Sequence, residues 1–258
     1  MNKTALITGA SSGIGMGLAT VFAKQKENLV LVARNAAKLE EMAKELTSKY
    51  GIKVNALAID LSELNSAQKV FDYCHKNNLS IDYLINNAGF GDFGLFAESK
   101  WEKQLQMINL NITTLTHLTH LFLPAMIKNN YGKLMNVAST AAFQPGPTMS
   151  VYYATKAFVL HFSEAIANEL EGSGVTVTAL CPGATESGFQ SAAAMEESKL
   201  VKGKKLPTSL EVAEYGYKAM MKGEKVAIHG IMNYLMANSV RFSPRAMVLK
   251  MVRMMQDK

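Results

Sequence analysis

The chain has 258 residues, 48% of them hydrophobic, which is enough to bury one large core. It contains no run of about 18 apolar residues and begins without the apolar stretch of a signal peptide, so we expect no transmembrane helix and no secretion. The net charge of +6 comes from the end of the chain, where residues 199–258 hold 12 Lys+Arg and 4 Asp+Glu. A basic tail without a nucleic-acid-binding motif argues against a nucleic-acid partner.

The two cysteines, Cys74 and Cys181, lie far apart in the sequence and match no metal-binding or redox spacing. We therefore expect no metal site and two ordinary buried thiols. Such cysteines are typical of a protein of the reducing cytoplasm.

The first predicted strand, residues 1–7, leads into a glycine-rich turn, and a predicted helix follows at residues 16–24. The turn reads Thr-Gly-Ala-Ser-Ser-Gly-Ile-Gly over residues 8–15. Glycines permit a tight turn and a close approach of the backbone to a pyrophosphate, and the free N–H groups of a helix N-terminus attract that anion. The pattern indicates dinucleotide binding; the alternative is that the glycines only form a turn.

Charged side chains follow the next two predicted strands. Strand 29–33 ends at Arg34, where NAD enzymes carry a carboxylate for the ribose hydroxyl. Arg34 can pair with a 2′-phosphate, which favours NADP; the alternative is a solvent-exposed arginine. Strand 54–59 ends at Asp60, which either accepts a hydrogen bond from an adenine amino group or caps the following helix, with Ser62 as a rival cap.

The fourth predicted strand, residues 83–85, runs into the motif Asn-Asn-Ala-Gly at residues 86–89. Small residues and amides suit a backbone that passes close to a flat ligand, although an ordinary turn is the alternative. A long helical segment then spans residues 98–129 and is interrupted at 109–111. A buried amide inside a helix is unfavourable unless it holds something, so we expect Asn111 to order a water molecule or to kink the helix.

The fifth predicted strand, residues 133–138, ends at Ser139, and Tyr152 and Lys156 lie on the first turns of the helix that follows. Residues four apart share one helix face, so the phenol and the ammonium point the same way. A cation beside a phenol favours the phenolate, and we expect Lys156 to lower the pKa of Tyr152 from its usual value near 10. Ser139 would lie at the carboxyl edge of the sheet, where open α/β sheets bind ligands.

The sixth predicted strand, residues 175–180, leads into Cys-Pro-Gly-Ala-Thr-Glu-Ser at 181–187, and a weak seventh covers 226–228. Short loops and alternating strands and helices require parallel pairing through right-handed crossovers. Because no internal repeat, low-complexity segment or linker interrupts the pattern, we expect one α/β domain over residues 1–258.

These motifs together resemble those of the short-chain dehydrogenases/reductases. The glycine-rich turn, Asn86–Gly89, Ser139, Tyr152–Lys156 and Pro182–Gly183 occur in the order of that family, and the resemblance is strong over residues 3–187. It implies a Rossmann-type, doubly wound, seven-stranded and mainly parallel sheet with helices on both faces. It also implies a nicotinamide cofactor and a catalytic set that comprises Asn111, Ser139, Tyr152 and Lys156.

The resemblance also implies the cofactor-binding residues, with Ser187, or Thr185 beside it, on the nicotinamide amide. The full predicted set is Gly9, Ser11, Ser12, Gly13, Ile14, Gly15, Arg34, Asp60, Asn87, Ala88, Gly89, Tyr152, Lys156, Pro182, Gly183, Thr185 and Ser187. The chain departs from the family pattern in two places. Thr114 stands where many members have glycine, and the glycine-rich turn has no basic residue, so the preference for NADP rests on Arg34 alone.

The implied reaction is hydride transfer between NADPH and a carbonyl carbon. Ser139 would polarise the carbonyl oxygen, Tyr152 would give or take the proton, and Lys156 would lower the phenol pKa and hold the nicotinamide ribose. Asn111 would position a water that links Lys156 to solvent. The alternatives in function are a dehydrogenase of a small 3-hydroxy acid or polyol, and a dinucleotide-binding regulator without turnover.

The family's substrate lid would lie at about residues 188–206, where apolar residues such as Phe189, Met195 and Leu200 favour an apolar substrate: a steroid, an acyl chain or a hydrophobic aldehyde. Helices near 99–128 and 151–172 carry apolar residues on more than one face, which predicts a homodimer or homotetramer.

The tail, residues 231–258, is basic and rich in methionine, and Pro244 is expected to separate two helices within it. Three arrangements of the tail are open: packing on its own fold beside the lid, packing on a neighbouring subunit, or lying on an anionic membrane. The first is favoured over the membrane contact, because the cations and methionines divide only loosely between two faces.

Overall fold

The structure, a computed structural model, describes residues 2–187 and 205–256. The predicted lid, residues 188–206, therefore lies outside the described residues except for its last two positions. Nearly all residues that the sequence assigns to the site and the tail fall within the described ranges.

Seven strands form one sheet in the order β3-β2-β1-β4-β5-β6-β7, and every neighbouring pair is parallel. The strands are β1 (Thr4–Thr8), β2 (Asn28–Ala33), β3 (Val54–Ala58), β4 (Tyr83–Asn86), β5 (Gly132–Val137), β6 (Val175–Cys181) and β7 (Val226–Ile228). This confirms the expected doubly wound, seven-stranded sheet and the weak seventh strand. The strand order reverses beside β1, which creates the crevice where ligands of such sheets bind.

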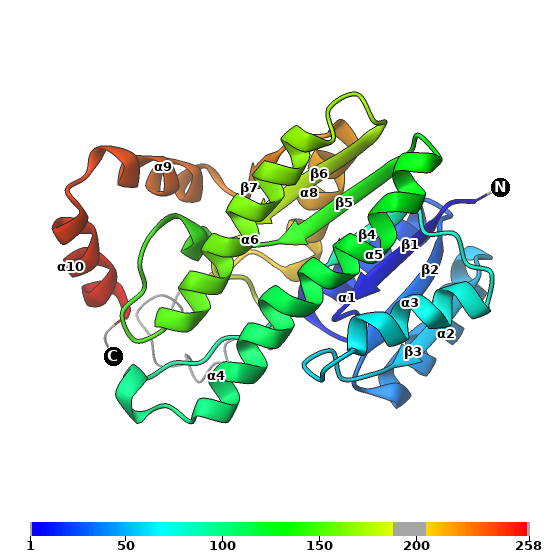
Figure 1. Cartoon of the computed structure of the whole chain (residues 1–258), viewed down its shortest axis with the longest axis horizontal. Helices are drawn as coiled ribbons and strands as arrows, with labels where there is room; N and C mark the ends of the chain where they lie inside the picture. Colours follow the sequence, from blue (N-terminus) through cyan, green and yellow to red (C-terminus); the bar gives the residue numbers. More distant parts are fainter. Residues whose placement is uncertain (1, 188–204, 257–258) are drawn as a thin grey trace.

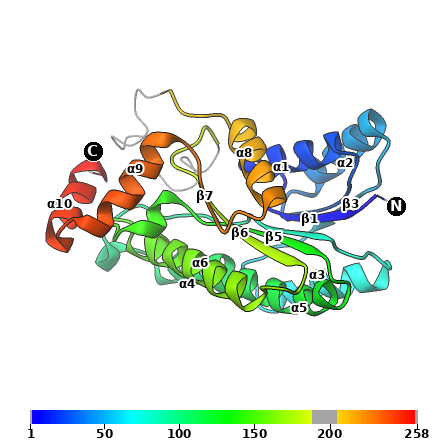
Figure 2. The same cartoon turned by 90° about the horizontal axis from the view of Figure 1, so that it is seen from above.

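Helices cover both faces of the sheet, as Figures 1 and 2 show. One face carries α1 (Gly13–Lys24), α2 (Ala36–Tyr50) and α8 (Ser209–Lys222), and the other carries α3 (Ser66–Lys76), α4 (Trp101–Ile108), α5 (Leu115–Lys128) and α6 (Ser150–Glu169). Side chains alternate along a strand, so Ile7 packs against the face with α1, α2 and α8, and Leu6 packs against the opposite face. Leu6, Ile7 and their neighbours in register, Leu84 and Ile85, are fully buried, so both faces of the central strands lie in the core.

Helix starts differ from the sequence prediction at two places. α1 begins at Gly13, inside the glycine-rich turn and three residues before the predicted start. α3 begins only at Ser66, after Asn65 in a left-handed conformation, so neither Asp60 nor Ser62 caps it. The capping interpretation of Asp60 was therefore wrong, because four residues separate Asp60 from the residue before the helix.

The predicted interruption of the long helical segment is present as a π-helical turn, η2 (Asn109–Thr114), between α4 and α5. A π turn inserts extra backbone into a helix and commonly occurs at functional sites. It brings Asn111 into the interior, where only 1% of the residue is exposed. The expectation of an irregular helix at Asn111 is confirmed.

The tail forms α9 (Ile231–Ser239), the short helix η4 (Val240–Phe242) and α10 (Arg245–Gln256), with Pro244 directly before α10 as predicted. Both helices lie at the end of the molecule toward which the strands point (Figure 1). Val248 and Val252 of α10 pack into a cluster of buried residues with Met149 and Tyr153. The described tail thus packs on its own fold. None of the described helices is long and apolar enough to cross a lipid bilayer.

Candidate active site

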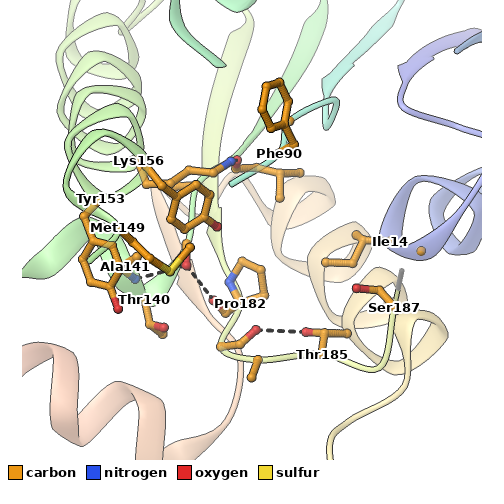
Figure 3. A pocket seen from close by; sticks show the side chains of 18 of the residues that line it. Ile14, Phe90, Thr140, Ala141, Met149, Tyr153, Lys156, Pro182, Thr185 and Ser187 are labelled. Carbon is orange, nitrogen blue, oxygen red and sulfur yellow. Dashed lines mark hydrogen bonds between the residues drawn. The ribbon is translucent and has the colours of Figure 1, made fainter. Parts of the chain in front are cut away.

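A cavity of about 1410 Å³ opens at the carboxyl ends of the strands and brings nearly all predicted site residues together. Of the predicted residues, those that line it are Gly9, Ser11, Ser12, Gly13, Ile14, Arg34, Asp60, Asn87, Ala88, Gly89, Ser139, Tyr152, Lys156, Pro182, Gly183, Thr185 and Ser187. Gly15 and Asn111 do not line it. Figure 3 shows Ile14 and Ser187 beside each other, with Tyr153 and Met149 across the cavity from them.

Thr8, at the end of β1, joins the glycine-rich turn to the motif at residues 86–89. Its Oγ1 accepts hydrogen bonds from the backbone N–H groups of Asn87 and Ala88, each at 2.9 Å. The Asn87 side chain donates in return to the Thr8 carbonyl at 2.8 Å. Gly9, with φ +65°, fits against them because a Cβ there would lie 2.8 Å from Asn87 Nδ2. The two motifs therefore form one rigid floor.

The N-terminus of α1 offers an anion site to the cavity. Ser12 precedes the helix and its side chain makes no capping hydrogen bond, so it does not block the first N–H groups. Gly13 has φ +55°, and a Cβ there would lie 3.2 Å from the Cβ of Ser187. These N–H groups and this glycine cradle fit the pyrophosphate of a dinucleotide. Gly15 is needed for packing instead, because a Cβ there would lie 2.2 Å from the Gly9 carbonyl oxygen.

Arg34 and Asp60 lie side by side at the ends of β2 and β3, with 3.8 Å between Arg34 Nη1 and Asp60 Oδ2. Asp60 Oδ1 also accepts hydrogen bonds from the backbone N and the hydroxyl of Ser62, at 2.9 and 2.7 Å. Partial burial raises the pKa of Asp60, but the Ser62 hydrogen bonds and the Arg34 charge outweigh it, and the net pKa is lowered. Asp60 thus stays ionised and holds Arg34 at the rim. The Arg34 side chain is 79% exposed and can turn toward an anion.

Tyr152 projects from the first turn of α6 and is only 8% exposed. Burial raises its pKa well above the usual value near 10, and a hydrogen bond with Ser139 only partly offsets this. The expectation that Lys156 lowers the pKa of Tyr152 below 10 is therefore wrong. Desolvation of the phenolate dominates, and Lys156, whose Nζ lies 5.8 Å from the centre of the ring, does not offset it.

Lys156 reaches across the end of β5, where its Nζ donates a hydrogen bond of 2.7 Å to the carbonyl oxygen of Val137. The residue is 6% exposed. Burial penalises the ammonium and lowers the pKa of Lys156 to about 8, although the nearby Cys181 opposes the shift slightly. Lys156 therefore carries a positive charge at neutral pH and can lose it under mildly alkaline conditions.

Ser139 follows β5 and begins the short helix η3 (Thr140–Phe143). Its hydroxyl oxygen accepts a hydrogen bond from the backbone N of Ala141 at 3.1 Å, and its proton is directed to the Pro182 carbonyl at 3.5 Å. The second contact is long, so the hydroxyl is held without being tightly bound. The hydroxyl also hydrogen-bonds with Tyr152, so the two hydroxyls lie side by side in the cavity.

Asn111 is buried behind the residues that line the cavity. Its side-chain amide donates to the Phe90 carbonyl and to Thr155 Oγ1, both at 3.0 Å, and its Oδ1 accepts from the Phe90 backbone N at 3.2 Å. It thus ties the segment after β4 to α6. Gly89 fits between Asn111 and Lys156, because a Cβ there would lie 3.0 Å from Asn111 Oδ1 and 3.5 Å from Lys156 Nζ. The predicted role in holding a water stays a prediction.

Thr114, the departure from the family pattern, has a structural partner of its own. Its hydroxyl donates a hydrogen bond of 2.7 Å to the carbonyl oxygen of Leu61. The residue is 6% exposed, so this bond satisfies a buried group of the loop after β3. The departure therefore ties the π turn to that loop.

Pro182, Gly183 and Thr185 follow β6, and the Thr185 hydroxyl donates to the Gly183 carbonyl at 3.0 Å. Gly183 contacts the tail, because a Cβ there would lie 2.6 Å from Asn233 Nδ2. Ser187 lies beyond the short bridge between Glu186 and Thr208. The segment that the sequence assigns to the nicotinamide amide thus lies over the N-terminus of α1.

Sequence reasoning missed the part of the site built by the tail and by Tyr153. The tail residues that line the cavity include Met232, Met236, Val248, Met251, Val252, Met255 and Gln256. Gln256 donates a hydrogen bond of 2.6 Å to the Tyr153 hydroxyl. The spacing of four between Val248, Val252 and Gln256 is the signal that could have indicated one buried face.

Comparison with known proteins gives a consistent picture. A family model described as short chain dehydrogenase matches residues 3–198. Over 189 residues the chain is 36% identical to the NADP-dependent 3-hydroxy acid dehydrogenase of Schizosaccharomyces pombe, covering 72% of this chain and 73% of that protein. Over 182 residues it is 36% identical to the very-long-chain 3-oxoacyl-CoA reductase of Phaeosphaeria nodorum, and the match covers 67% of this chain and 52% of that protein. The matches to these and another curated relative span from 52% to 73% of the relatives' lengths.

Two solved structures are similar over almost the whole chain. The short-chain dehydrogenase from Sphingobium yanoikuyae, solved in complex with NADPH, is 33% identical with a TM-score of 0.83, and 93% of this chain and 94% of that chain are covered. The bulky-bulky ketone specific alcohol dehydrogenase from Comamonas testosteroni is 29% identical with a TM-score of 0.79, and the match covers 93% of this chain and 92% of that chain.

Proposed function

Because the chain belongs to the short-chain dehydrogenase family, we propose that it is an NADP(H)-dependent oxidoreductase that interconverts a carbonyl group and a secondary alcohol on an apolar substrate. The observation that carries this proposal is the convergence of Ser139, Tyr152 and Lys156 in the same cavity as the glycine-rich turn and Arg34. A proton donor and an anion cradle in one cavity are what such a reaction requires.

Each side chain of the site has a separate role in the proposed reaction. A bound nicotinamide supplies the hydride. Tyr152, which its raised pKa keeps protonated at neutral pH, donates its proton to the carbonyl oxygen, and Ser139 polarises the same oxygen. Lys156 carries a positive charge on the same helix face and would hold the ribose of a bound nicotinamide, although its charge does not offset the burial that raises the pKa of Tyr152. Asn111 is a positioning residue, since it holds the Phe90 backbone and α6 in place.

The preference for NADP is supported by Arg34, an exposed guanidinium at the rim of the cavity with Asp60 beside it. A guanidinium suits a 2′-phosphate through paired hydrogen bonds. The Schizosaccharomyces relative is named as NADP-dependent and the Sphingobium structure was solved with NADPH, which points to the same cofactor for those proteins. Because the glycine-rich turn adds no second cation, we expect a moderate preference.

An apolar substrate is supported by the methionine and valine side chains that the tail contributes to the cavity. A small 3-hydroxy acid is the second candidate, and the name of the Schizosaccharomyces relative favours it. A polyol and a dinucleotide-binding regulator without turnover are the remaining alternatives. We further propose a cytoplasmic location, with which the two free, buried thiols agree, and a homodimer or homotetramer.

The test is a panel of ketones, aldehydes, 3-hydroxy acids and polyols offered with NADP(H) and with NAD(H), followed by absorbance of the reduced nicotinamide. We expect NADPH-dependent reduction of apolar ketones to give the highest kcat/KM. Turnover that is fastest with 3-hydroxy acids would establish the second candidate. Tight NADPH binding without turnover of any compound would favour the regulator.

A further inference from the structure

The last helix of the chain presents one buried face to the cavity. Val248, Val252 and Gln256, each four residues apart, are 6%, 2% and 0% exposed. All three line the cavity, and the two valines pack with Met149 and Tyr153. A wall of the candidate active site is therefore supplied by α10.

A fully buried amide fastens this wall to the catalytic helix. Gln256 Nε2 donates to the Tyr153 hydroxyl at 2.6 Å, and Gln256 Oε1 accepts from the Thr148 hydroxyl at 3.1 Å. Thr148 adopts the left-handed conformation with φ +66°, and its carbonyl oxygen accepts from the backbone N of Gly94 at 2.8 Å. Because buried polar groups are costly to leave unpaired, these bonds resist separation of α10 from the loop before α6.

Tyr153 itself is held tightly from a second side. A Cβ at Gly146 would lie 2.2 Å from the Tyr153 ring, so the glycine backbone packs flat against the aromatic face. Tyr153 follows Tyr152 directly on the first turn of α6, and the two ring centres lie 6.1 Å apart. Tyr153 is therefore held by the loop before α6 and by its own helix, independently of Gln256, and is a fixed anchor for α10.

The chemistry of the tail wall indicates what it contacts. Methionine is flexible and adapts to irregular apolar surfaces. The methionines that line the cavity are Met149, Met232, Met236, Met251 and Met255. The four cations of the described tail are Arg241, Arg245, Lys250 and Arg253, and none of them lines the cavity. This wall therefore suits an apolar group and offers no cation to a carboxylate.

We propose that Gln256 is a positioning residue that clamps α10 onto the first turn of α6, and that the chamber closed in this way takes ketones with a bulky apolar group on the carbonyl carbon. The inference rests on the proposed function for its substrate and on the described contacts for its clamp. The bulky group lies against α10, while the carbonyl lies at Tyr152. Ketones too small to reach α10 do not depend on the clamp.

The test compares three variants with the wild type. Gln256→Leu keeps the size of the side chain and removes both hydrogen bonds. Val252→Phe leaves the clamp in place and fills the chamber from the same wall. Met254→Leu is the matched control, because Met254 is 68% exposed on the same helix and does not line the cavity. Each variant is measured for kcat and KM with a diaryl ketone and with butanone, for the Kd of NADPH, and for amide hydrogen exchange of α10.

For Gln256→Leu we expect faster exchange in α10 and a rise of about tenfold in KM for the diaryl ketone, the effect of losing about 1.4 kcal/mol of binding. Butanone kinetics and the Kd of NADPH should stay within a few-fold. For Val252→Phe we expect the same loss of the diaryl ketone with unchanged exchange. Met254→Leu should match the wild type throughout.

Unchanged exchange in Gln256→Leu would overturn the clamp. Equal losses for both ketones in Gln256→Leu, or an unchanged ratio in Val252→Phe, would overturn the substrate assignment. A wild type that reduces butanone or other carbonyls of the panel but not the diaryl ketone would overturn this substrate class alone, whereas one that turns over no compound of the panel would contradict the proposed function. The exchange of α10 would decide the clamp in either case.

Discussion

Lys156 donates a hydrogen bond from Nζ to the carbonyl oxygen of Val137 at 2.7 Å, which fixes a buried ammonium at the end of β5. Burial lowers the pKa of Lys156 to about 8 from its usual value of 10.5. Below pH 8 this lysine is protonated in both the folded and the unfolded chain, so burial of the ammonium lowers the free energy of unfolding by its full amount. As the pH rises from 8 to 10.5 the folded chain releases its proton first, so the stability contributed by this residue increases.

We therefore predict that the free energy of unfolding of the wild type increases relative to that of Lys156→Met as the pH rises. Between pH 7 and pH 9.5 the difference should change by about 2 kcal/mol in favour of the wild type. Urea denaturation at several pH values measures it. The buried Cys74, whose pKa is raised to about 12, titrates in the opposite sense but equally in both proteins, whereas loss of the Lys156 charge raises the pKa of Cys181 further in the variant. A difference that does not vary with pH would contradict the prediction.

Replacing Tyr152 with phenylalanine removes one hydroxyl from the cavity. Because this hydroxyl is the proposed proton donor, we expect kcat to fall by about 10²-fold or more. The Kd of NADPH, measured by fluorescence titration, should change by only a few-fold. Tyr50→Phe at the far end of α2 is the control. A Tyr152→Phe enzyme that keeps more than about a tenth of the wild-type rate would exclude Tyr152 as the acid.

Arg34→Asp should reverse the cofactor preference. The change removes the cation, adds repulsion toward a 2′-phosphate beside Asp60, and offers a carboxylate to the ribose hydroxyls of NAD. We expect the ratio of kcat/KM for NADPH to that for NADH to fall by about tenfold or more, the effect of about 1.4 kcal/mol. Lys38→Asp, an equal change of charge on neighbouring α2, should leave the ratio nearly unchanged. An unaltered ratio in Arg34→Asp would show that another group reads the phosphate.

Gly89→Ala should impair catalysis more than stability. The new Cβ would lie 3.0 Å from Asn111 Oδ1, so it would displace the amide that holds Phe90 and Thr155. We expect lower kcat with little change in melting temperature. Gly51→Ala is the opposite control: its Cβ meets nothing within 4 Å, but φ is +67°. That variant should lose about 1 kcal/mol of stability and keep its kinetics. Similar behaviour of both variants would count against a positioning role for Asn111.

The proposed oligomer uses the outer faces of α4 and α6. Trp101 and Leu105 are 58% and 42% exposed, and Phe158 is 39% exposed and stacked on Phe162. We predict a dimer or tetramer by light scattering at micromolar concentration, and a shift toward the monomer in Phe158→Glu. Leu64→Glu, at an exposed position of the loop before α3 and outside these helices, should not dissociate it. A wild-type monomer would refute the prediction.

The sequence alone determined the fold class and most of the floor of the site. Strand–helix alternation requires parallel pairing, and parallel pairing brings every strand end to one edge. Thr8, Arg34, Asp60, Asn87 and Ser139 all lie at or shortly after the ends of strands, so their grouping followed from chain order. Tyr152 and Lys156 were placed together because helix geometry relates residues four apart. Such features depend on local periodicity, which a sequence displays directly.

Only the tertiary structure decided the pKa values and the wall of the chamber. The pKa of Tyr152 is raised because its burial outweighs the neighbouring cation, and burial depends on the whole fold. The partner of Arg34 is Asp60, and the helix cap that was one of two interpretations of Asp60 does not form. Gln256 meets Tyr153 across 103 positions of the chain, a pairing that no local pattern encodes. Contacts of this kind arise when separate elements pack together, and that packing decides which polar groups lose water and which partner they find.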